Sequence, residues 1–197
     1  MSGDGRPKRW GALMIALHWL AAANILALLA IGWIMIYAGL SSAATFDAYQ
    51  LHKSLGFAIL ALTLARLGAR VVVVPPSAPA AARWERSLAA FTQGALYVLT
   101  IGAIVAGWLL VSASPLPIPT RFFDLFVIPN IAKPDAALFA AAKLAHKWMA
   151  WAIACLVALH SAGALKHHVL DRDDVLTRML PRLRLSGPRP SGAARDS

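Results

Sequence analysis

Residues 140–168 read AAAKLAHKWMAWAIACLVALHSAGALKHH, and this stretch decides the class of fold. It is apolar, contains no proline and exceeds the roughly 20 residues with which a helix crosses a bilayer. Two histidines, His146 and His160, interrupt it 14 residues apart. Fourteen residues rise about 21 Å and complete nearly four turns, so both rings project from one face at two depths. Ionisable side chains within a membrane are costly and mark function.

The rest of the chain repeats this apolar pattern. Hydrophobic residues make up 59% and charged residues 14% of the 197 residues, whereas a soluble domain has roughly 25% charged residues. We predict four membrane-spanning helices at about 10–37, 50–74, 88–111 and 140–165, separated by breaks rich in glycine and proline. The sequence therefore predicts an all-α, integral membrane four-helix bundle over residues 1–181. Residues 182–197, rich in Arg, Pro and Ser, are expected to form a disordered cytoplasmic tail.

Basic residues are unequally divided between the two ends of the predicted bundle. The end with both termini carries 14 Lys and Arg residues and the other end carries five. The positive-inside rule then places both termini in the cytoplasm. The formal net charge of +10 does not indicate nucleic-acid binding, because the charges flank apolar runs rather than covering a soluble surface. The single cysteine, Cys155, excludes an intramolecular disulfide.

The depths of the histidines predict two pairs. His18 lies near the start of the first helix, level with His160, and His52 lies near the start of the second, level with His146. Two opposed imidazoles are the axial ligands that six-coordinate haem iron needs. The sequence has no CxxCH motif, so such haems are non-covalent and b-type. One zinc or copper site holding all four is excluded, because its ligands must cluster within a few ångströms.

Arg66 follows His52 by 14 residues and therefore lies on the same helix face, near the inner pair. An arginine there suits the anionic propionates of a haem. An arginine at a helix end also simply reaches the membrane surface, and the sequence does not choose between these two interpretations.

Several segments together resemble the bacterial cytochrome b561 family of four-helix dihaem membrane proteins. They are Leu17-His18-Trp19, His52-Lys-Ser-Leu-Gly56, Ala65-Arg66-Leu67 and the stretch from His146 to His168. The resemblance implies two haem b groups with His18, His160, His52 and His146 as axial ligands. It also implies a multi-pass protein of the bacterial inner membrane that passes electrons to ubiquinone. One branch of the family is a superoxide oxidase, which oxidises periplasmic superoxide to dioxygen.

Both ends of the expected electron path carry candidate residues. Lys53, Lys143 and Lys147 adjoin the outer ligands, where positive charge would steer anionic superoxide. Lysines are also common where helices leave the membrane. His167, His168 and Arg172 follow the fourth helix at the inner end, where they would donate hydrogen bonds and protons to a quinone. The alternative is a polar interfacial patch that binds no ligand.

Two other functions stay open from the sequence. One is a haem-bearing anchor subunit that passes electrons between a dehydrogenase or hydrogenase and the quinone pool, which would require a protein redox partner. The other is a bundle without haem whose histidines are structural. The loops expected outside are short or apolar, which favours a protein that acts alone with the lipid bilayer, superoxide and quinone as its partners. The longest connection includes residues 121–126, RFFDLF, expected as a short amphipathic piece at the membrane surface.

Overall fold

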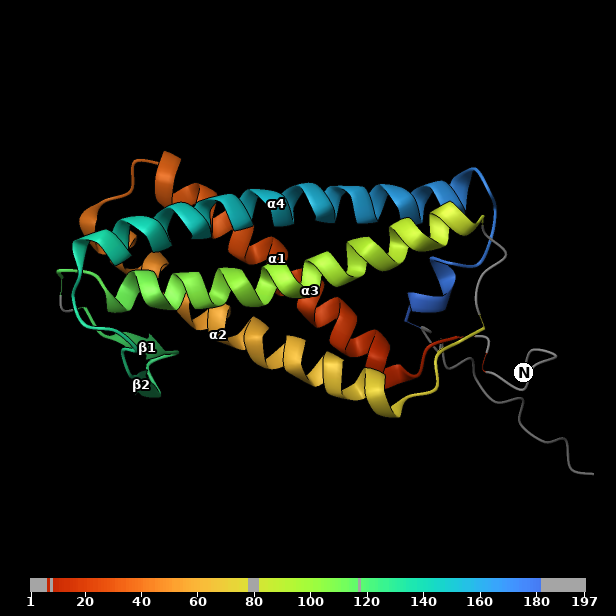
Figure 1. Cartoon of the computed structure of the whole chain (residues 1–197), viewed down its shortest axis with the longest axis horizontal. Helices are drawn as coiled ribbons and strands as arrows, with labels where there is room; N and C mark the ends of the chain where they lie inside the picture. Colours follow the sequence, from red (N-terminus) through yellow and green to blue (C-terminus); the bar gives the residue numbers. More distant parts are fainter. Residues whose placement is uncertain (1–6, 8, 78–81, 117, 182–197) are drawn as a thin grey trace, which may run out of the picture.

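The computed structural model describes residue 7 and residues 9–77, 82–116 and 118–181. Four long helices cross its length: α1 Ala12–Tyr37, α2 Ser42–Val72, α3 Arg83–Ser112 and α4 Ala136–Val169. All four are long and apolar enough to span a bilayer. The predicted all-α membrane bundle is therefore confirmed (Figure 1). The predicted tail, residues 182–197, lies outside the described residues.

Local signals set the helix ends. Gly39 has a φ of +60°, a conformation that ends α1 and that glycine adopts without strain. The Ser41 hydroxyl caps α2 by accepting from the amide of Ala44, and Asp135 caps α4 by accepting from the amide of Leu138 at 2.7 Å. At the start of α3 the amide of Ala82 donates to the Glu85 carboxylate. With these caps, α2 and α4 begin before the predicted spans do, at Ser42 rather than Gln50 and at Ala136 rather than Ala140.

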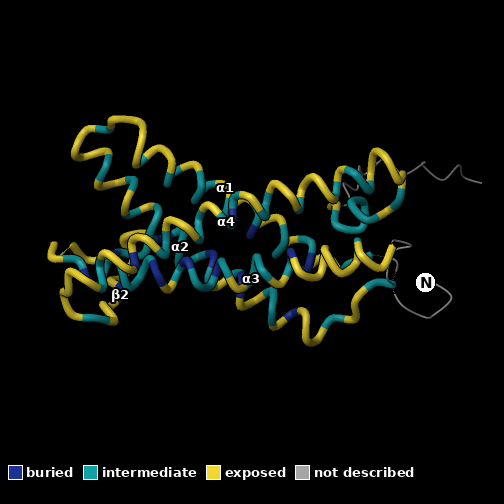
Figure 2. Tube along the Cα trace, turned by 45° about the horizontal axis from the view of Figure 1, so that its top comes forward, coloured by how far each residue is buried: buried dark blue, intermediate teal, exposed yellow. Residues whose placement is uncertain are grey.

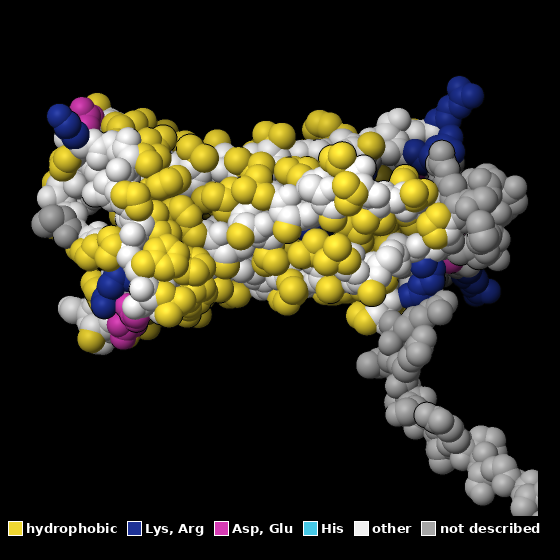
Figure 3. All heavy atoms as spheres, turned by 90° about the horizontal axis from the view of Figure 1, so that it is seen from below, with side chains coloured by type: hydrophobic (Ala, Val, Ile, Leu, Met, Phe, Trp, Pro, Cys, Tyr) yellow, Lys and Arg dark blue, Asp and Glu magenta, His cyan; other side chains and the backbone are white. Residues whose placement is uncertain are grey.

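The helices pack as two pairs, α1 along α2 and α3 along α4, with α2 and α3 joining the pairs. Small side chains fill these contacts, and the buried set includes Ala103, Ala106, Ala142, Ser54 and Thr63. Small residues let membrane helices approach closely. Many positions along the helices are exposed (Figure 2), and large apolar side chains are common among them. These apolar side chains form a band with Lys and Arg at both ends (Figure 3). That distribution suits lipid around the middle and water at the ends.

A two-stranded hairpin stands at one end of the bundle. Strands β1 Thr120–Phe122 and β2 Phe126–Ile128 pair antiparallel, and Phe123 and Asp124 in the turn have positive φ values. Two successive positive φ values match the twist of a hairpin. The segment expected as a short amphipathic piece is thus a hairpin, the one sheet among the described residues. We call this end of the bundle the hairpin end.

The opposite end, which we call the terminal end, holds both ends of the described chain. The Arg9 guanidinium donates to the carbonyl of Leu180, and the Trp19 indole donates to the carbonyl of Met179 at 2.7 Å. The 3₁₀ turn Thr177–Met179 is thereby held against the start of α1. The two ends of the described chain therefore lie at the same end of the bundle. The predicted placement of the termini in the cytoplasm stays a prediction.

Candidate functional site

The hairpin end brings together His52 of α2 and His146 of α4. Their ring centres are 6.1 Å apart and their planes are inclined by 75°. Both residues are partly buried, and Nδ1 of His52 is buried without a hydrogen-bond partner. A buried and unpaired ring nitrogen costs free energy unless something binds it. This end therefore holds two opposed imidazoles from two different helices.

Helix α3 supplies no ligand here but borders the pair. His146 Nδ1 donates to the backbone carbonyl of Ala103 at 2.7 Å. A Cβ atom added at Gly107 would lie 3.2 Å from both Cε1 and Nδ1 of the same ring. On α1, a Cβ added at Gly32 would lie 3.6 Å from His52 Cε1. Both glycines thus leave room for an imidazole next to a helix backbone.

The terminal end brings together His18 of α1 and His160 of α4. Their ring centres are 6.2 Å apart, their planes are inclined by 59°, and both residues are partly buried. Trp19 meets the edge of the His18 ring at a centroid distance of 5.5 Å. The bundle therefore contains two histidine pairs, one toward each end, and α4 contributes one ring to each pair.

Arg66 of α2 lies beside the terminal pair. Its Nη2 donates to His18 Nδ1 at 3.2 Å, and its guanidinium lies 5.5 Å from the centre of the Tyr97 ring on α3. Arg66 Nε and the Tyr97 hydroxyl are both buried without a hydrogen-bond partner. An unpaired guanidinium nitrogen near an unpaired hydroxyl forms a place where a carboxylate would be well bound.

The distances suit a metal ion held between each pair. Metal–nitrogen bonds to histidine are about 2.0 Å long, so two imidazoles on opposite sides of one ion have ring centres about 6 Å apart. None of the four histidines belongs to a cluster of three or more metal-binding groups in the described part of the chain. Two axial nitrogens without further protein ligands fit a metal whose equatorial ligands belong to a porphyrin. The residues present therefore fit b-type haem.

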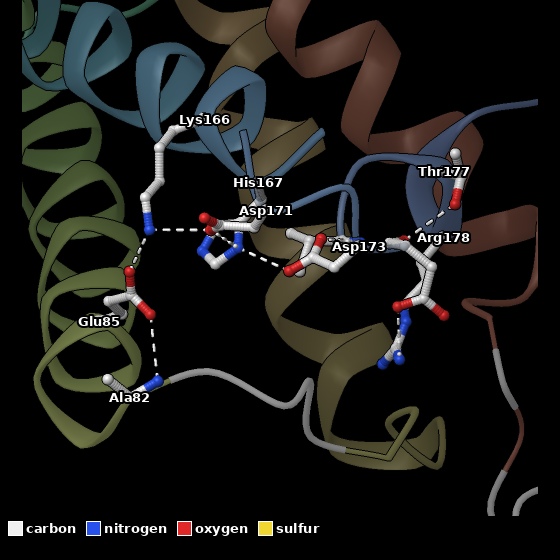
Figure 4. Close-up of polar contacts among 10 residues, drawn as sticks. Ala82, Glu85, Lys166, His167, Asp171, Asp173, Thr177 and Arg178 are labelled. Atoms are coloured by element: carbon white, nitrogen blue, oxygen red, sulfur yellow. Dashed lines mark hydrogen bonds and ion pairs between the residues drawn. The ribbon is translucent and has the colours of Figure 1, made fainter. Parts of the chain in front are cut away.

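A separate polar cluster lies at the terminal end, where α3 begins and α4 ends (Figure 4). His167 Nδ1 lies 2.7 Å from an Asp173 carboxylate oxygen and 3.1 Å from one of Asp171. The Lys166 ammonium bridges the carboxylates of Glu85 and Asp171. Glu85, His167 and Asp171 approach one another closely enough to hold a metal ion. The Lys166 ammonium already balances the two carboxylates, so this grouping is explained without one.

The other two residues of the predicted quinone group, His168 and Arg172, are near His167 in the sequence but do not join this cluster. His168 and Arg172 are exposed, and Arg172 has a φ of +53° in the turn that follows α4. Basic residues in the last turn of α4 also suit the negative end of the helix dipole. Of the three predicted residues, the structure therefore builds only His167 into a hydrogen-bonded arrangement.

The three predicted steering lysines differ in their surroundings. The Lys53 ammonium donates to the Pro119 carbonyl at 3.2 Å, beside the hairpin. Lys143 and Lys147 are exposed on α4, and the Lys147 ammonium lies 5.9 Å from the ring centre of Trp148. Two of the three lysines are thus free to act on an approaching anion, whereas Lys53 is tied to the loop.

Sequence reasoning missed Ala103, Gly107 and Tyr97, all on α3. A backbone carbonyl, a glycine and a lone tyrosine carry no spacing that distinguishes them from ordinary residues of an apolar helix. The 3.6-residue periodicity does connect Ala103 with Gly107, since they lie four residues apart on one face. Only the rotation of α3 against α4 shows that this face meets His146.

A membrane bundle with opposed histidine pairs at two levels is the architecture of a membrane cytochrome. The family model described as prokaryotic cytochrome b561 matches residues 9–182, and the chain belongs to this family. It is 33% identical over 181 residues to cytochrome b561 homolog 2 of Escherichia coli, covering 91% of this chain and 95% of that protein. It is 26% identical over 180 residues to a protein of Yersinia pestis named "Probable superoxide oxidase CybB", covering 90% and 98%.

Family membership agrees with the fold. The chain is a multi-pass bacterial membrane protein that binds b-type haem and transfers electrons through it.

Proposed function

We propose that this protein carries electrons across the inner membrane through two b-type haems, from superoxide on the periplasmic side to ubiquinone on the cytoplasmic side. The observation that carries the proposal is the presence of two opposed histidine pairs, 6.1 Å and 6.2 Å between ring centres, toward opposite ends of the bundle. His52 and His146 would hold one haem, and His18 and His160 the other. A bound b-type haem supplies a one-electron carrier at each level.

Each protein group has a defined task in this proposal. The four imidazoles bind the two groups and set their separation across the membrane. Arg66, with the Tyr97 hydroxyl, would bind a propionate at the terminal end, because both have buried polar atoms without partners. The apolar helices exclude water from the path between the pairs. Polar residues at the two ends would attract superoxide and quinone, and those at the terminal end would pass protons to the quinone.

The electron balance sets what each end must do. Two superoxide anions each lose one electron and become dioxygen. One ubiquinone takes up both electrons and two protons to become the quinol. At the hairpin end, Lys143 and Lys147 would raise the local concentration of the anionic donor. At the terminal end, His167, oriented by Asp173, would hydrogen-bond the quinone and pass on protons, with His168 and Arg172 nearby.

Superoxide as donor is supported by the name of the Yersinia relative and by the two exposed lysines. The test exposes the purified haem-loaded protein to enzymatically generated superoxide and records the reduced α-band. We expect rapid haem reduction, followed by reoxidation when a soluble ubiquinone is added. Superoxide dismutase must abolish the reduction. A haem that stays oxidised in superoxide would overturn the enzyme activity and favour the anchor-subunit alternative.

The contribution of the lysines has its own control. Replacing Lys143 and Lys147 together by Gln should slow reduction by superoxide about threefold to tenfold at low ionic strength, and less in high salt. Lys133→Gln removes one such charge outside the helices. It is the matched control for Lys143→Gln and Lys147→Gln made singly, and it should change the rate less than either. Equal effects of all three replacements would mean that net charge, not position, governs the rate.

A further inference from the structure

The two histidine pairs differ in what meets the second nitrogen of their rings. A backbone carbonyl only accepts hydrogen bonds, so the 2.7 Å contact with Ala103 requires that His146 Nδ1 carries the proton. The other ring nitrogen, Nε2, then keeps its lone pair, which is the form that binds a metal. None of the other three rings has a carbonyl or carboxylate partner among the described residues. Of the four histidines, His146 is therefore the one that a backbone carbonyl of α3 orients among the described residues, although α3 itself supplies no histidine.

Gly107 makes this contact sterically accessible. The Ala103 carbonyl is also the i−4 acceptor of the Gly107 amide within α3, and a carbonyl oxygen has a second lone pair to offer. A side chain at Gly107 would lie over that lone pair, since its Cβ would come within 3.2 Å of His146 Nδ1 and Cε1. Ala103 is itself only 8% exposed, so water does not compete for the carbonyl. The hydrogen bond is therefore short and partly buried, and a side chain at Gly107 would crowd the ring that makes it.

The terminal pair has the opposite electrostatic environment. Arg66 places a guanidinium nitrogen 3.2 Å from His18 Nδ1, in the partly buried interior. An acceptor on the Nδ1 proton makes an imidazole a stronger electron donor to its metal and so favours the oxidised ion. A nearby positive charge favours the reduced ion, because reduction lowers the positive charge of the site. The two effects reinforce each other. An iron held by the hairpin-end pair would have the lower electron affinity, and an iron held by the terminal pair the higher one.

Resting on the proposed dihaem function, we infer that Ala103 and Gly107 form a positioning site that fixes the His146 tautomer and gives the hairpin-end haem the lower midpoint potential. Electron transfer from the hairpin end to the terminal end would then be thermodynamically favourable. Ala103 and Gly107 are positioning residues, because they act only through His146.

The first experiment is a spectroelectrochemical titration of the haem-loaded full-length protein. We compare the wild type with Gly107→Ala, Gly102→Ala and Gly94→Ala. A Cβ at Gly102 would also meet a neighbour at 3.2 Å, but that neighbour is the flexible end of Met149, and a Cβ at Gly94 would meet nothing within 4 Å. We expect Gly107→Ala to shift the lower midpoint potential upward, or to weaken haem binding there about 10- to 100-fold. The two controls should leave both potentials in place.

A second experiment decides the order of the potentials without relying on the fold of Gly107→Ala. His160→Ala should retain only the lower-potential component, and His146→Ala only the higher one. The reverse assignment would overturn the inference, as would a Gly107→Ala titration identical to the wild type. Loss of both components in Gly107→Ala signals misfolding, and the single-histidine variants then decide. A wild type without two b-type components would instead contradict the proposed function itself.

Discussion

Arg66 places a permanent positive charge among apolar helices, beside the terminal histidine pair. Its Nη2 donates to His18, its guanidinium lies over Tyr97, and its Nε has no partner. A guanidinium offers donors only, so the contact with His18 uses Nδ1 as the acceptor. Binding of a metal at His18 Nε2 requires the proton on Nδ1. The hydrogen bond from Arg66 Nη2 must then break in favour of another acceptor, while the positive charge stays beside the pair. A propionate is the acceptor that the proposed cofactor offers.

Replacing Arg66 by Gln removes the charge while keeping a hydrogen-bond donor. We expect the midpoint potential of the terminal-end haem to fall, because the reduced form loses its electrostatic stabilisation. Arg66→Lys should retain most of the potential but bind haem less firmly, since lysine lacks the planar fork. Redox titration and haem content measure the two effects. A fall of equal size at both haems would show that Arg66 acts as distant charge and not as a neighbour of His18.

The pairing of the histidines makes a prediction about haem content. His160→Ala should remove only the terminal-end haem, so the reduced α-band falls to about half. Cys155→Ala, on the same helix but at an exposed position, is the control and should retain both haems. Pyridine haemochrome analysis of the purified proteins gives the stoichiometry. Loss of both haems from a folded His160→Ala protein would contradict the pairing.

At the scale of elements, the hairpin is held to α2 by hydrogen bonds, and two of them share one buried hydroxyl. Ser54 Oγ accepts from the amide of Phe123 at 3.0 Å and lies 2.9 Å from the Arg121 carbonyl. Gln50 adds two further hydrogen bonds, donating to Pro119 and accepting from Arg121. The hairpin therefore depends on polar contacts, while its Leu125 and Phe126 side chains remain exposed.

Ser54→Ala should loosen the hairpin without affecting haem binding. It leaves buried backbone groups unpaired, at a cost of about 1–3 kcal/mol. Hydrogen exchange should become faster across residues 119–129, and haem content should stay unchanged. Ser42→Ala, at an exposed position in the first turn of α2, is the matched control and should leave hairpin exchange as it is. Unchanged exchange in Ser54→Ala would show that the contacts of Gln50 and Lys53 suffice to hold the hairpin.

At the scale of the whole molecule, an exposed apolar band lies between two charged ends that differ from each other, as in a membrane protein. The ends of the described chain meet at the terminal end, and the hairpin marks the other. Because Lys and Arg are concentrated toward the terminal end, we expect that end in the cytoplasm.

Cysteine labelling tests this orientation. In a Cys155→Ser background, Asp124→Cys in the hairpin turn should react with a membrane-impermeant thiol reagent in intact spheroplasts. Ser197→Cys should react only after the membrane is permeabilised. The reverse pattern would invert the protein and place the proposed superoxide site in the cytoplasm.

Much of this architecture is local in origin and therefore predictable from sequence. Apolar length defines a spanning helix, and the fixed rise of 1.5 Å per residue converts the spacing of His146 and His160 into depth. Depth alone pairs the same residues that lie together in the structure. The helix ends are less predictable, because α2 and α4 begin several residues before the predicted spans, where caps at Ser41 and Asp135 stabilise their first turns.

The sequence by itself thus determined the membrane bundle, the depths of its histidines and the basic terminal end, since each depends on residue type and position along one helix. Only the tertiary structure decided which face of α3 meets His146, that Arg66 and Tyr97 converge, and that Lys53 is tied to the loop. Those contacts depend on how one helix is rotated against the next. That rotation arises from packing of small residues over the whole interface, and a backbone carbonyl such as that of Ala103 leaves no mark in the sequence.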